Sequence, residues 1–599
     1  MSTVPLRSAI APEHTWNGPS VFATPADWQA AAKSLSETIP TLQRFAGHLG
    51  DDPQTLLEAL HAQEEIGMPL GKVFVYASMA ANVDTADAEA ATMEGQARGL
   101  FGLFLATVSY VEPEILAIGQ ATLQTWAAQE PRLNQYAHYF ENLFRKQAHV
   151  RSAEVEEVLG LAADPLFSFR AIENVLTNAE MPFRPAISST GESIPVFQGN
   201  LDTLVIDKDR EIRRTAWESY ADGYLALKQT LTSNLTGAVK SDIFNARARR
   251  YPSALEASLF ESNIPVSVFR NVLETYRKNL PTWHRYWAVR RRALGVEKLH
   301  SYDVQVPLSP ASPHIPYAQA VEWIGAGLQP LGDAYVAQVR RGTLQDRWVD
   351  IYPNQNKTSG AFSSGAPSTH PFILMSYDDT ILSLSTLAHE LGHSMHSYLA
   401  WKTQPLVYTD YSLFVAEVAS NFHQAMVRAH LFETNPDPAF QLAVIDEAMN
   451  NFHRYFFIMP TLARFELEMH ERIERGESPS ADTLNGLMSD YLAEGYGPDV
   501  VVDRERDGIT WAQFGHLYAN FYVYQYTTGI SAANMLAEKV RSGGPAAAEN
   551  YLTFLKTGSA RYPIDALKVA GVDMGTPEAV ERTFGILAGL VDRLETLVR

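Results

Sequence analysis

One short segment, residues 389–393 with the sequence His-Glu-Leu-Gly-His, restricts this chain more than any other feature of it. In an α-helix, His389 and His393 lie one turn apart and only about 40° apart around the axis, so both can bind one metal ion. Glu390 lies beside them, where its carboxylate reaches a water on the metal more readily than the metal itself. The segment therefore predicts a helix near residues 383–400 that carries a hydrolytic metal site.

A third protein ligand is expected, because catalytic zinc usually takes three side chains and leaves a fourth position for water. A histidine six residues past His393 would be one solution, but that position is Leu399, and His396 is expected to pack or to support a ligand. Glu417 is the better candidate, because a lone carboxylate in an apolar helical segment is costly unless it is paired or binds metal. We therefore predict that His389, His393 and Glu417 hold one Zn²⁺ per chain. A salt bridge for Glu417, and Mn²⁺ or Co²⁺ in place of zinc, remain open.

These segments together resemble those of a known family. The chain is similar to the oligoendopeptidase F group of the thimet-oligopeptidase-like (M3) zinc metallopeptidases, over residues 385–396, 416–420 and 516–526. The resemblance implies a mainly α, large, two-lobed metallopeptidase with a deep substrate cleft or channel. It also implies oligopeptide substrates, because a walled channel admits only short flexible chains. Gln424 is a departure, since relatives often carry there an acid that supports a zinc-bound histidine, and an amide brings no charge.

Helical periodicity dominates the chain, most clearly over residues 25–180. The pattern changes around residues 181–206, which read as a β-hairpin. We therefore predict an N-terminal helical region over residues 1–198 and a catalytic domain over residues 199–599. Residues 348–376 read as a small β-sheet next to the zinc-binding helix.

Peptide hydrolysis builds an oxyanion, which needs hydrogen-bond donors besides the metal, and histidine and tyrosine side chains can both donate. Tyr524 is eight residues beyond His516, on a neighbouring helical face, so both can point into one cleft. Spacing alone does not rank Tyr524 above Tyr518, Tyr522 or Tyr526. By resemblance, His516 and Tyr524 are the favoured donors, with Tyr522 next. Packing in an aromatic core is the alternative for each tyrosine.

Small residues over 359–367 precede the predicted strand. Glycines let a substrate backbone approach closely, and an exposed strand edge can pair with an extended peptide. We therefore predict that Gly360, Ala361 and Phe362 contact the substrate, mainly through its main chain. An ordinary flexible loop is the alternative.

The composition of the chain restricts which classes of partner we expect it to bind. The chain has 599 residues, of which 46% are hydrophobic and 19% charged, as is typical of globular proteins. Its formal net charge of −20 argues against a nucleic-acid partner. No apolar run approaches the roughly 18 residues of a membrane span, and the first twenty residues lack the apolar core of a signal peptide. We expect no membrane partner and a cytoplasmic location, and leave the oligomeric state open between a monomer and a homodimer.

The sequence thus favours a zinc-dependent endopeptidase in which Glu390 accepts the proton of the attacking water. An exopeptidase with the same ligands, a carboxypeptidase for example, is the main alternative. A non-catalytic peptide-binding protein and a purely structural metal site fit less well, because neither has a use for Glu390.

Overall fold

The computed structural model describes residues 4–309 and 313–599, and it is mainly α-helical, as the sequence predicts. The helices and short strands group into two compact units, each built from three separate stretches of chain. Unit 1 comprises Met1–Ala148, His314–His430 and Leu536–Gly571, and unit 2 comprises His149–Pro313, Leu431–Met535 and Val572–Arg599. The boundary predicted between residues 198 and 199 follows a change of sequence pattern and stays a prediction.

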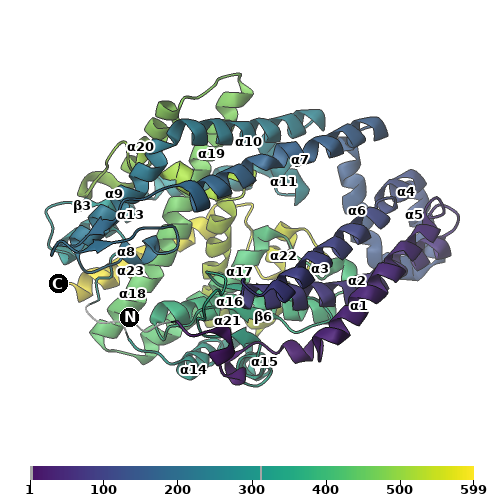
Figure 1. The fold of residues 1–599 in the computed structure, drawn as a ribbon, viewed down its shortest axis with the longest axis horizontal. Coiled ribbons are helices and arrows are strands. Elements are labelled where there is room, and N and C mark those ends of the chain that lie inside the picture. The colour runs from purple at the N-terminus through teal and green to yellow at the C-terminus, as the bar shows by residue number, and fades with distance from the viewer. Residues whose placement is uncertain (1–3, 310–312) are drawn as a thin grey trace. The chain divides into compact units, whose positions relative to one another are not determined.

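Unit 1 combines long helices with a three-stranded sheet (Figure 1). Its helices are α1 (Pro25–Thr38), α2 (Pro53–Val83), α3 (Ala88–Thr107), α4 (Val111–Ile118), α5 (Gln120–Gln129), α6 (Ala137–Lys146), α14 (Tyr317–Gly327), α15 (Asp333–Leu344), α16 (Ile381–Thr403), most of α17 (Leu413–Thr434), residues 536–555 of α21 (Tyr524–Leu555) and α22 (Pro563–Val569). Its strands are β4 (Val349–Asp350), β5 (Phe362–Ser364) and β6 (Phe372–Leu374).

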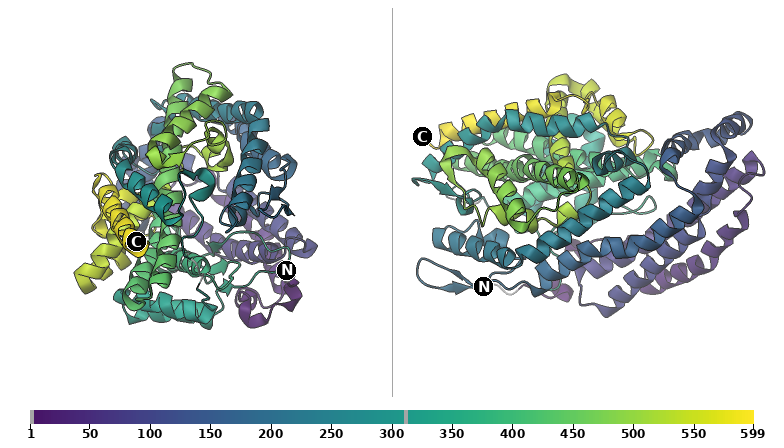
Figure 2. Two further views of the ribbon diagram at one scale, coloured as in Figure 1. Left: turned by 90° about the vertical axis from the view of Figure 1, so that its left-hand side faces the viewer. Right: turned by 90° about the horizontal axis from the view of Figure 1, so that it is seen from above.

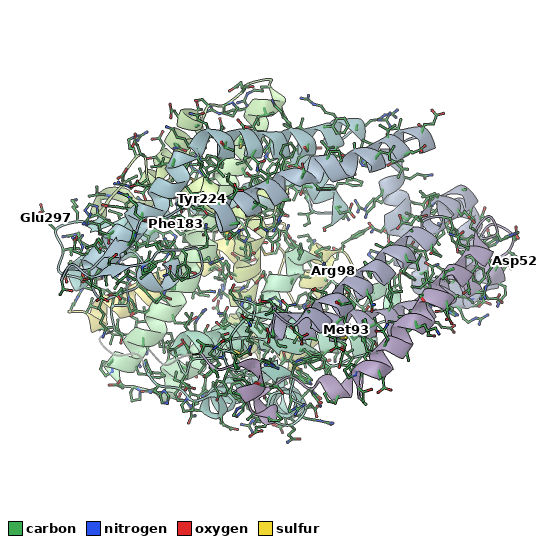
Figure 3. The ribbon with its side chains drawn as sticks, viewed as in Figure 1. Asp52, Met93, Arg98, Phe183, Tyr224 and Glu297 are labelled. Carbon is green, nitrogen blue, oxygen red and sulfur yellow. The ribbon has the colours of Figure 1, made fainter. Side chains whose placement is uncertain are left out.

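The first three helices, α1 to α3, pack along one another (Figure 1). Each turns an apolar face toward the others, and Trp28, Val73 and Leu100 are buried in the core that they share. The indole N–H of Trp28 donates to the backbone oxygen of Val73 at 2.9 Å, so the buried polar atom is satisfied. Asp52, labelled in Figure 3, caps α2 by accepting the backbone N–H groups of the first helical turn.

The small sheet predicted within residues 348–376 is present, with the strand order β4-β6-β5. β4 runs parallel to β6, whereas β5 runs antiparallel to β6 and forms an edge of the sheet. The fully buried Asp350 of β4 accepts two hydrogen bonds from Arg7, at 2.8 and 2.6 Å, and pairs with the ammonium group of Lys357 at 2.7 Å. These charges compensate one another inside the protein and tie the segment around Arg7 to the sheet.

Unit 2 contains the remaining helices and two short two-stranded sheets. Its helices are α7 (Ala153–Val175), α8 (Leu201–Leu204), α9 (Arg210–Ala226), α10 (Lys228–Ala248), α11 (Ala254–Glu261), α12 (Val266–Lys278), α13 (Leu280–Ala293), α18 (Pro438–His453), α19 (Met459–Glu474), α20 (Ala481–Tyr496) and α23 (Glu578–Leu597). Its strands are β1 (Ala186–Ile187), β2 (Ser193–Ile194), β3 (Leu299–His300) and β7 (Val500–Val501). The predicted β-hairpin is confirmed by the antiparallel pairing of β1 with β2.

Aromatic side chains fill the interior of unit 2. Trp283 and Trp287 of α13 stack on each other and pack against His453 and Phe457. The yellow C-terminal helix α23 packs along α13 (Figure 2), with Arg285 bound to Glu595 at 2.8 Å. Elsewhere in this unit, Tyr220 packs against Phe183 with the ring centres 5.3 Å apart and against Tyr224 at 5.0 Å; Phe183 and Tyr224 are labelled in Figure 3. Such large apolar surfaces supply most of the burial that stabilises a domain.

The expectation that no apolar run approaches a membrane-spanning length needs a correction. Within the described residues, Ala88–Ile118 contains one window that is long and apolar enough by length and composition, and little of it is buried. A single window of this kind is weak evidence for a membrane span, because core helices of many folds pass the same test. Here the stretch is divided into α3 and α4 by a break at residues 108–110.

Candidate metal centre and donor cluster

Helix α16 carries the His-Glu-Leu-Gly-His segment, as the sequence predicts. It begins after Thr380, whose side chain accepts the backbone N–H of Ser383 at 3.1 Å and so caps the helix. One face of α16, which includes Leu384, Leu387 and Leu391, is fully buried. Burial of that face fixes the rotation of the helix and thereby the direction of its two histidines.

The structure brings together the three predicted metal ligands, all of them in unit 1. One nitrogen each of His389 and His393 on α16 and one carboxylate oxygen of Glu417 on α17 lie within 4.8 Å of one another. His389 Nε2 is 3.4 Å from Glu417 Oε2. Three such donors around a common point are a set that suits one tetrahedral metal ion with a position left for water.

Gly392 allows α16 and α17 to approach closely enough for this convergence. A Cβ atom at this position would lie 2.4 Å from the backbone oxygen of Ala419 and 2.5 Å from Cα of Ser420. Both neighbours are backbone atoms of α17, so a side chain at position 392 would push the helices apart.

The carboxyl group of Glu390 is buried beside the three ligands. It accepts a hydrogen bond from the backbone N–H of Ser363, whereas its Oε2 has no hydrogen-bond partner among the described residues. Burial raises the pKa of Glu390 to about 7, and the charge of Glu417 acts in the same direction. Burial also lowers the pKa of His393 to about 4, so this imidazole is neutral near pH 7 and able to bind metal.

Gln424 and Ser385 orient His389. The amide nitrogen of Gln424 donates to Ser385 Oγ at 2.8 Å, so its oxygen accepts the Nδ1–H of His389 at 3.1 Å. This hydrogen bond leaves Nε2 of His389 as the nitrogen that faces Glu417. The amide of Gln424 therefore supplies the acceptor for His389 without bringing a charge.

His396 is not part of the ligand group, as expected. Its side chain is 1% exposed and stacks on Tyr411 with the ring centres 3.7 Å apart. Burial lowers the pKa of His396 to about 3. His396 therefore packs in the interior of unit 1.

The predicted substrate segment leads into β5 at the edge of the small sheet. Gly360 has a φ of +88°, which glycine adopts without strain, and Phe362 is the first residue of β5. The next residue, Ser363, contacts α16 twice, through its N–H to Glu390 and through Oγ, which is 2.8 Å from Ser394 Oγ. These two serines were not identified from the sequence, because a serine in a small-residue loop carries no distinctive pattern.

His516 lies in unit 2, within a cluster of tyrosines. Its ring stacks on Tyr522 with the centres 6.2 Å apart and meets Tyr526 edge-on at 5.8 Å. The hydroxyl groups of Tyr522 and Tyr526 are 3.0 Å apart. Burial lowers the pKa of His516 to about 4, and the positive charges of Arg454 and Arg170 act in the same direction. A neutral imidazole retains one N–H donor.

The expectation of one continuous helix through residues 516–526 is wrong. A short 3₁₀ helix ends at Tyr518, and α21 begins only at Tyr524, so helical phase does not relate Tyr524 to His516. Tyr524 is 1% exposed and packs edge-on against Phe269, 5.2 Å between ring centres, whereas Tyr522 is partly exposed. A phenol that donates to substrate must reach the surface of a site, so this burial favours Tyr522 over Tyr524. Tyr518 accepts a hydrogen bond from Asn234 at 3.0 Å.

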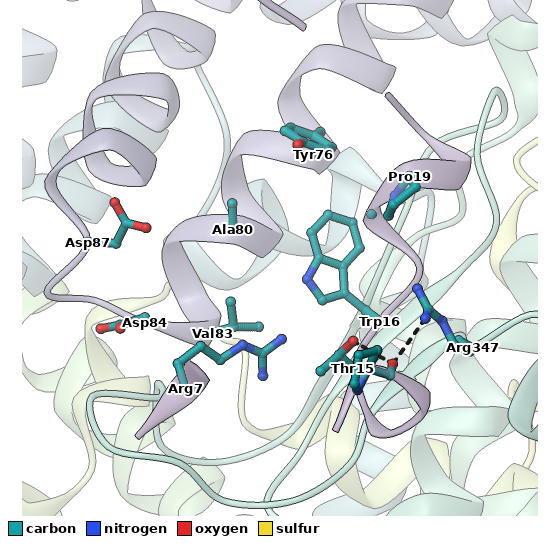
Figure 4. Close-up of a pocket in the computed structure, with 12 residues that line it drawn as sticks. Arg7, Thr15, Trp16, Pro19, Tyr76, Ala80, Val83, Asp84, Asp87 and Arg347 are labelled. Atoms are coloured by element: carbon teal, nitrogen blue, oxygen red, sulfur yellow. Dashed lines mark hydrogen bonds between the residues drawn. The ribbon is translucent and has the colours of Figure 1, made fainter. Parts of the chain in front are cut away.

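A cavity of about 500 Å³ in unit 1 contains none of the predicted site residues (Figure 4). Its arginines are already engaged, Arg7 with Asp350 and Arg347 with the backbone oxygen of Pro12. Asp87 accepts two backbone N–H groups at the start of α3. The charged groups of this cavity therefore support the fold around them.

Two histidines and a glutamate beside a buried carboxyl group are the arrangement of a metal-dependent hydrolase. Residues 203–586 match peptidase family M3, and residues 114–183 match the family described as Oligopeptidase F. The chain therefore belongs to peptidase family M3 and, within it, to the oligoendopeptidase F group of metalloendopeptidases.

Relatives match almost the whole chain. Oligopeptidase PepF of Bacillus subtilis is 35% identical over 596 residues, which cover 99% of this chain and 89% of that protein. Group B oligopeptidase PepB of Streptococcus agalactiae is 33% identical over 592 residues, covering 99% and 98%. The crystal structure of oligoendopeptidase-F from Enterococcus faecium has a TM-score of 0.74 at 30% identity, over 96% of this chain and 99% of that chain.

Proposed function

We propose that this metallopeptidase hydrolyses internal peptide bonds of short oligopeptides, with one Zn²⁺ per chain held by His389, His393 and Glu417. The observation that carries the proposal is the convergence of these three side chains beside the carboxyl group of Glu390. Two imidazole nitrogens and one carboxylate oxygen fit Zn²⁺. When bound, Zn²⁺ would polarise the scissile carbonyl group and lower the pKa of water. The names of the relatives, oligopeptidase and oligoendopeptidase, support oligopeptides as the substrate class.

Glu390 acts as the general base. Its Oε2, which has no hydrogen-bond partner in the described part of the chain, takes the proton of the attacking water. The same oxygen then passes the proton to the departing amine. Ser363 N–H holds the other oxygen of Glu390, so the carboxyl group keeps one orientation during both transfers.

His516 and a tyrosine donate hydrogen bonds to the oxyanion. His516 is neutral near pH 7 because burial lowers its pKa, so its N–H is a donor that needs no change of charge. Burial counts against Tyr524, which the resemblance prefers, so we take Tyr522, the next tyrosine by resemblance, which is partly exposed and stacks on His516, and keep Tyr524 as the second choice.

The edge strand β5 and the residues before it hold the substrate. Gly360, Ala361 and Phe362 are partly or fully exposed, and β5 is paired with β6 on one side only. An extended peptide can add to such an edge through main-chain hydrogen bonds, which gives broad side-chain tolerance.

Mass spectrometry of a graded set of unmodified peptides, from very short to protein-length, tests this function. The zinc-loaded protein is compared with its Glu390→Gln form, which should keep its zinc and lose turnover by about 10²–10⁴-fold. Internal cuts confined to short and medium peptides, and absent with the variant, would support the proposal. Stepwise loss from one end would assign an exopeptidase, and no cleavage with zinc bound would leave a peptide-binding protein. The cytoplasmic location, the absence of nucleic-acid and membrane partners, and the oligomeric state stay predictions.

A further inference from the structure

The residue before Tyr522 has an unusual backbone conformation. Phe521 has a φ of +49°, in the left-handed region that residues other than glycine rarely adopt. Such a conformation is strained and persists only where the surroundings impose it. Phe521 itself is fully buried against Phe269 and His470. The direction of the chain at Tyr522 therefore depends on whatever holds Phe521 in place.

The peptide group between Asn520 and Phe521 is held at both ends. Its carbonyl oxygen accepts a hydrogen bond from Ser258 Oγ of α11 at 2.9 Å. Its N–H donates to Glu466 Oε1 of α19 at 2.7 Å. Two opposed hydrogen bonds fix the plane of this peptide group, and the plane in turn sets φ of Phe521. Tyr522 N–H then donates to the oxygen of Ala519 at 3.1 Å and closes the turn.

Burying the carboxyl group of Glu466 costs free energy, which the hydrogen bond to Phe521 N–H must offset. It is 3% exposed, and its Oε2 has no hydrogen-bond partner among the described residues. Burial raises the pKa of Glu466 well above its usual value, and the nearby charge of Asp242 acts in the same direction. Burial therefore favours the protonated, uncharged form of this carboxyl group. A buried polar group with one unsatisfied oxygen lowers stability relative to an apolar side chain, so its use must lie in the bond to Phe521 N–H.

We propose that Glu466 is a positioning residue for His516 and Tyr522: together with Ser258 it holds the Asn520–Phe521 peptide group and thereby directs Tyr522 toward His516. The inference rests on the proposed role of His516 and Tyr522 as oxyanion donors. Glu466 touches neither substrate nor metal in this assignment. Its effect reaches the reaction only through the turn that precedes α21.

Replacing Glu466 by Gln and by Leu tests the inference in the full-length, zinc-loaded protein. Glu466→Gln keeps an oxygen acceptor and the volume of the protonated side chain, so its kcat should stay within about threefold of wild type. Leu removes the acceptor, and kcat should fall by about tenfold or more with KM little changed, since loss of a well-placed oxyanion donor costs about 10²–10³-fold. Leu should also weaken binding of a phosphinic peptide, which mimics the tetrahedral oxyanion, more than binding of a product peptide.

Asp446 of α18 provides the matched control. It is another carboxyl group in unit 2 that accepts backbone N–H groups, from Leu308 and Ser309, and whose pKa burial raises. Asp446→Leu should leave kcat within about twofold of wild type. An equal loss of kcat in Asp446→Leu and Glu466→Leu would overturn the inference, because it would reflect general weakening of unit 2. If Glu466→Leu does not fold, Ser258→Ala releases the other end of the peptide group and should lower kcat several-fold.

Tyr522→Phe separates this inference from the function on which it rests. If Tyr522→Phe leaves kcat unchanged, the donor role of Tyr522 fails, and the positioning role fails with it. If Tyr522→Phe lowers kcat and a folded Glu466→Leu does not, the donor role stands and the inference is wrong. If kcat falls in both Tyr522→Phe and Glu466→Leu while Glu466→Gln stays near wild type, the result supports both the donor role of Tyr522 and the positioning role of Glu466.

Discussion

The amide of Gln424 decides which nitrogen of His389 faces Glu417. Because its own N–H₂ group donates to Ser385, its oxygen is left to accept Nδ1–H of His389. A carboxylate in the same place would accept the same proton and add a negative charge, which raises the basicity of the imidazole. The amide therefore keeps the orientation of His389 but does not add the negative charge that would raise the basicity of its imidazole.

Two substitutions of Gln424 should separate these contributions. Gln424→Glu should tighten zinc binding, because the added charge strengthens His389 as a ligand. Gln424→Leu should weaken it by about 10–100-fold, because the Nδ1–H loses its acceptor. Competition with a chelator of known zinc affinity measures both, and Ser385→Ala is the control for loss of the neighbouring hydroxyl group. Equal zinc affinity in all variants would contradict this account of Gln424.

His453 illustrates a residue whose burial links stability to pH. It is enclosed by Trp283, Trp287 and Phe457, and burial lowers its pKa to about 3, with the charge of Arg290 acting in the same direction. An imidazole in the unfolded chain has a pKa of about 6.5. Between these values the unfolded state binds more protons, so the contribution of neutral His453 is present at pH 7 and is lost as pH falls below about 6.5.

His453→Phe should remove this loss, because phenylalanine fits an aromatic site and does not titrate. Lowering the pH from 7 to 5 should reduce the free energy of unfolding of the wild type by about 2 kcal/mol more than that of the variant. Urea denaturation at the two pH values measures the difference. The same loss in both proteins would show that His453 is not the group that takes up the proton.

At the residue scale, the sequence predicted that His389, His393 and Glu417 lie together, and they do, whereas the choice among the tyrosines needed the structure. Helical spacing relates His389 to His393, while Glu417 was singled out as a lone carboxylate in an apolar helical segment. That the three side chains bind zinc stays a prediction. His516 and Tyr524 are separated by a turn at Phe521, so their relation depends on tertiary contacts. Those contacts, from Ser258 and Glu466, come from helices far away in the sequence.

At the scale of elements, the convergence of the three proposed metal ligands depends on how closely α16 and α17 approach at Gly392. Gly392→Ala would place a methyl group within 2.4 Å of a backbone oxygen of α17. We expect the helices to separate, a destabilisation of about 1–3 kcal/mol, and a marked loss of zinc affinity because Glu417 moves away from the two histidines. Thermal unfolding and chelator competition measure the two effects.

Gly99→Ala in α3 of the same unit is the matched control, because nothing lies within 4 Å of a Cβ atom there. It should change stability by no more than about 1 kcal/mol, in the stabilising direction, since alanine is the better helix former. If Gly392→Ala behaves like Gly99→Ala, the close approach of the helices is not what the metal centre requires.

Long elements with a clear period were predictable, and short ones were less so. Helix α16 and strand β6 follow from the apolar periods of their segments, and the β1–β2 hairpin follows from its turn residues. The break between α3 and α4 was not predicted, because residues 108–110 (Val-Ser-Tyr) contain no proline or glycine that would mark the end of a helix. The edge position of β5 depends on pairing with β6, which local sequence does not specify.

At the scale of the whole molecule, local sequence patterns do not predict which stretches of chain come together in each of the two units. Each unit joins stretches that lie hundreds of residues apart, as shown by Arg7 with Asp350 in unit 1 and Arg285 with Glu595 in unit 2. Such pairings arise from the folded topology, and neither the periodicity of apolar residues nor a turn motif predicts them. The predicted boundary at residue 198 follows local pattern, which is a different property of the chain.

All three proposed zinc ligands belong to unit 1, so zinc should stabilise that unit directly. A ligand that binds only the folded state adds RT ln(1 + [L]/Kd), about 4 kcal/mol when free zinc is a thousand times Kd. Hydrogen–deuterium exchange should therefore slow most in α16 and α17 when the chelator-treated protein is loaded with zinc, and less in α13 of unit 2. A His393→Asn, Glu417→Gln double variant should show no such response to zinc. Equal slowing in the variant would mean that zinc acts at some other place in the chain, whereas a response confined to the wild type would assign the stabilisation to these three side chains.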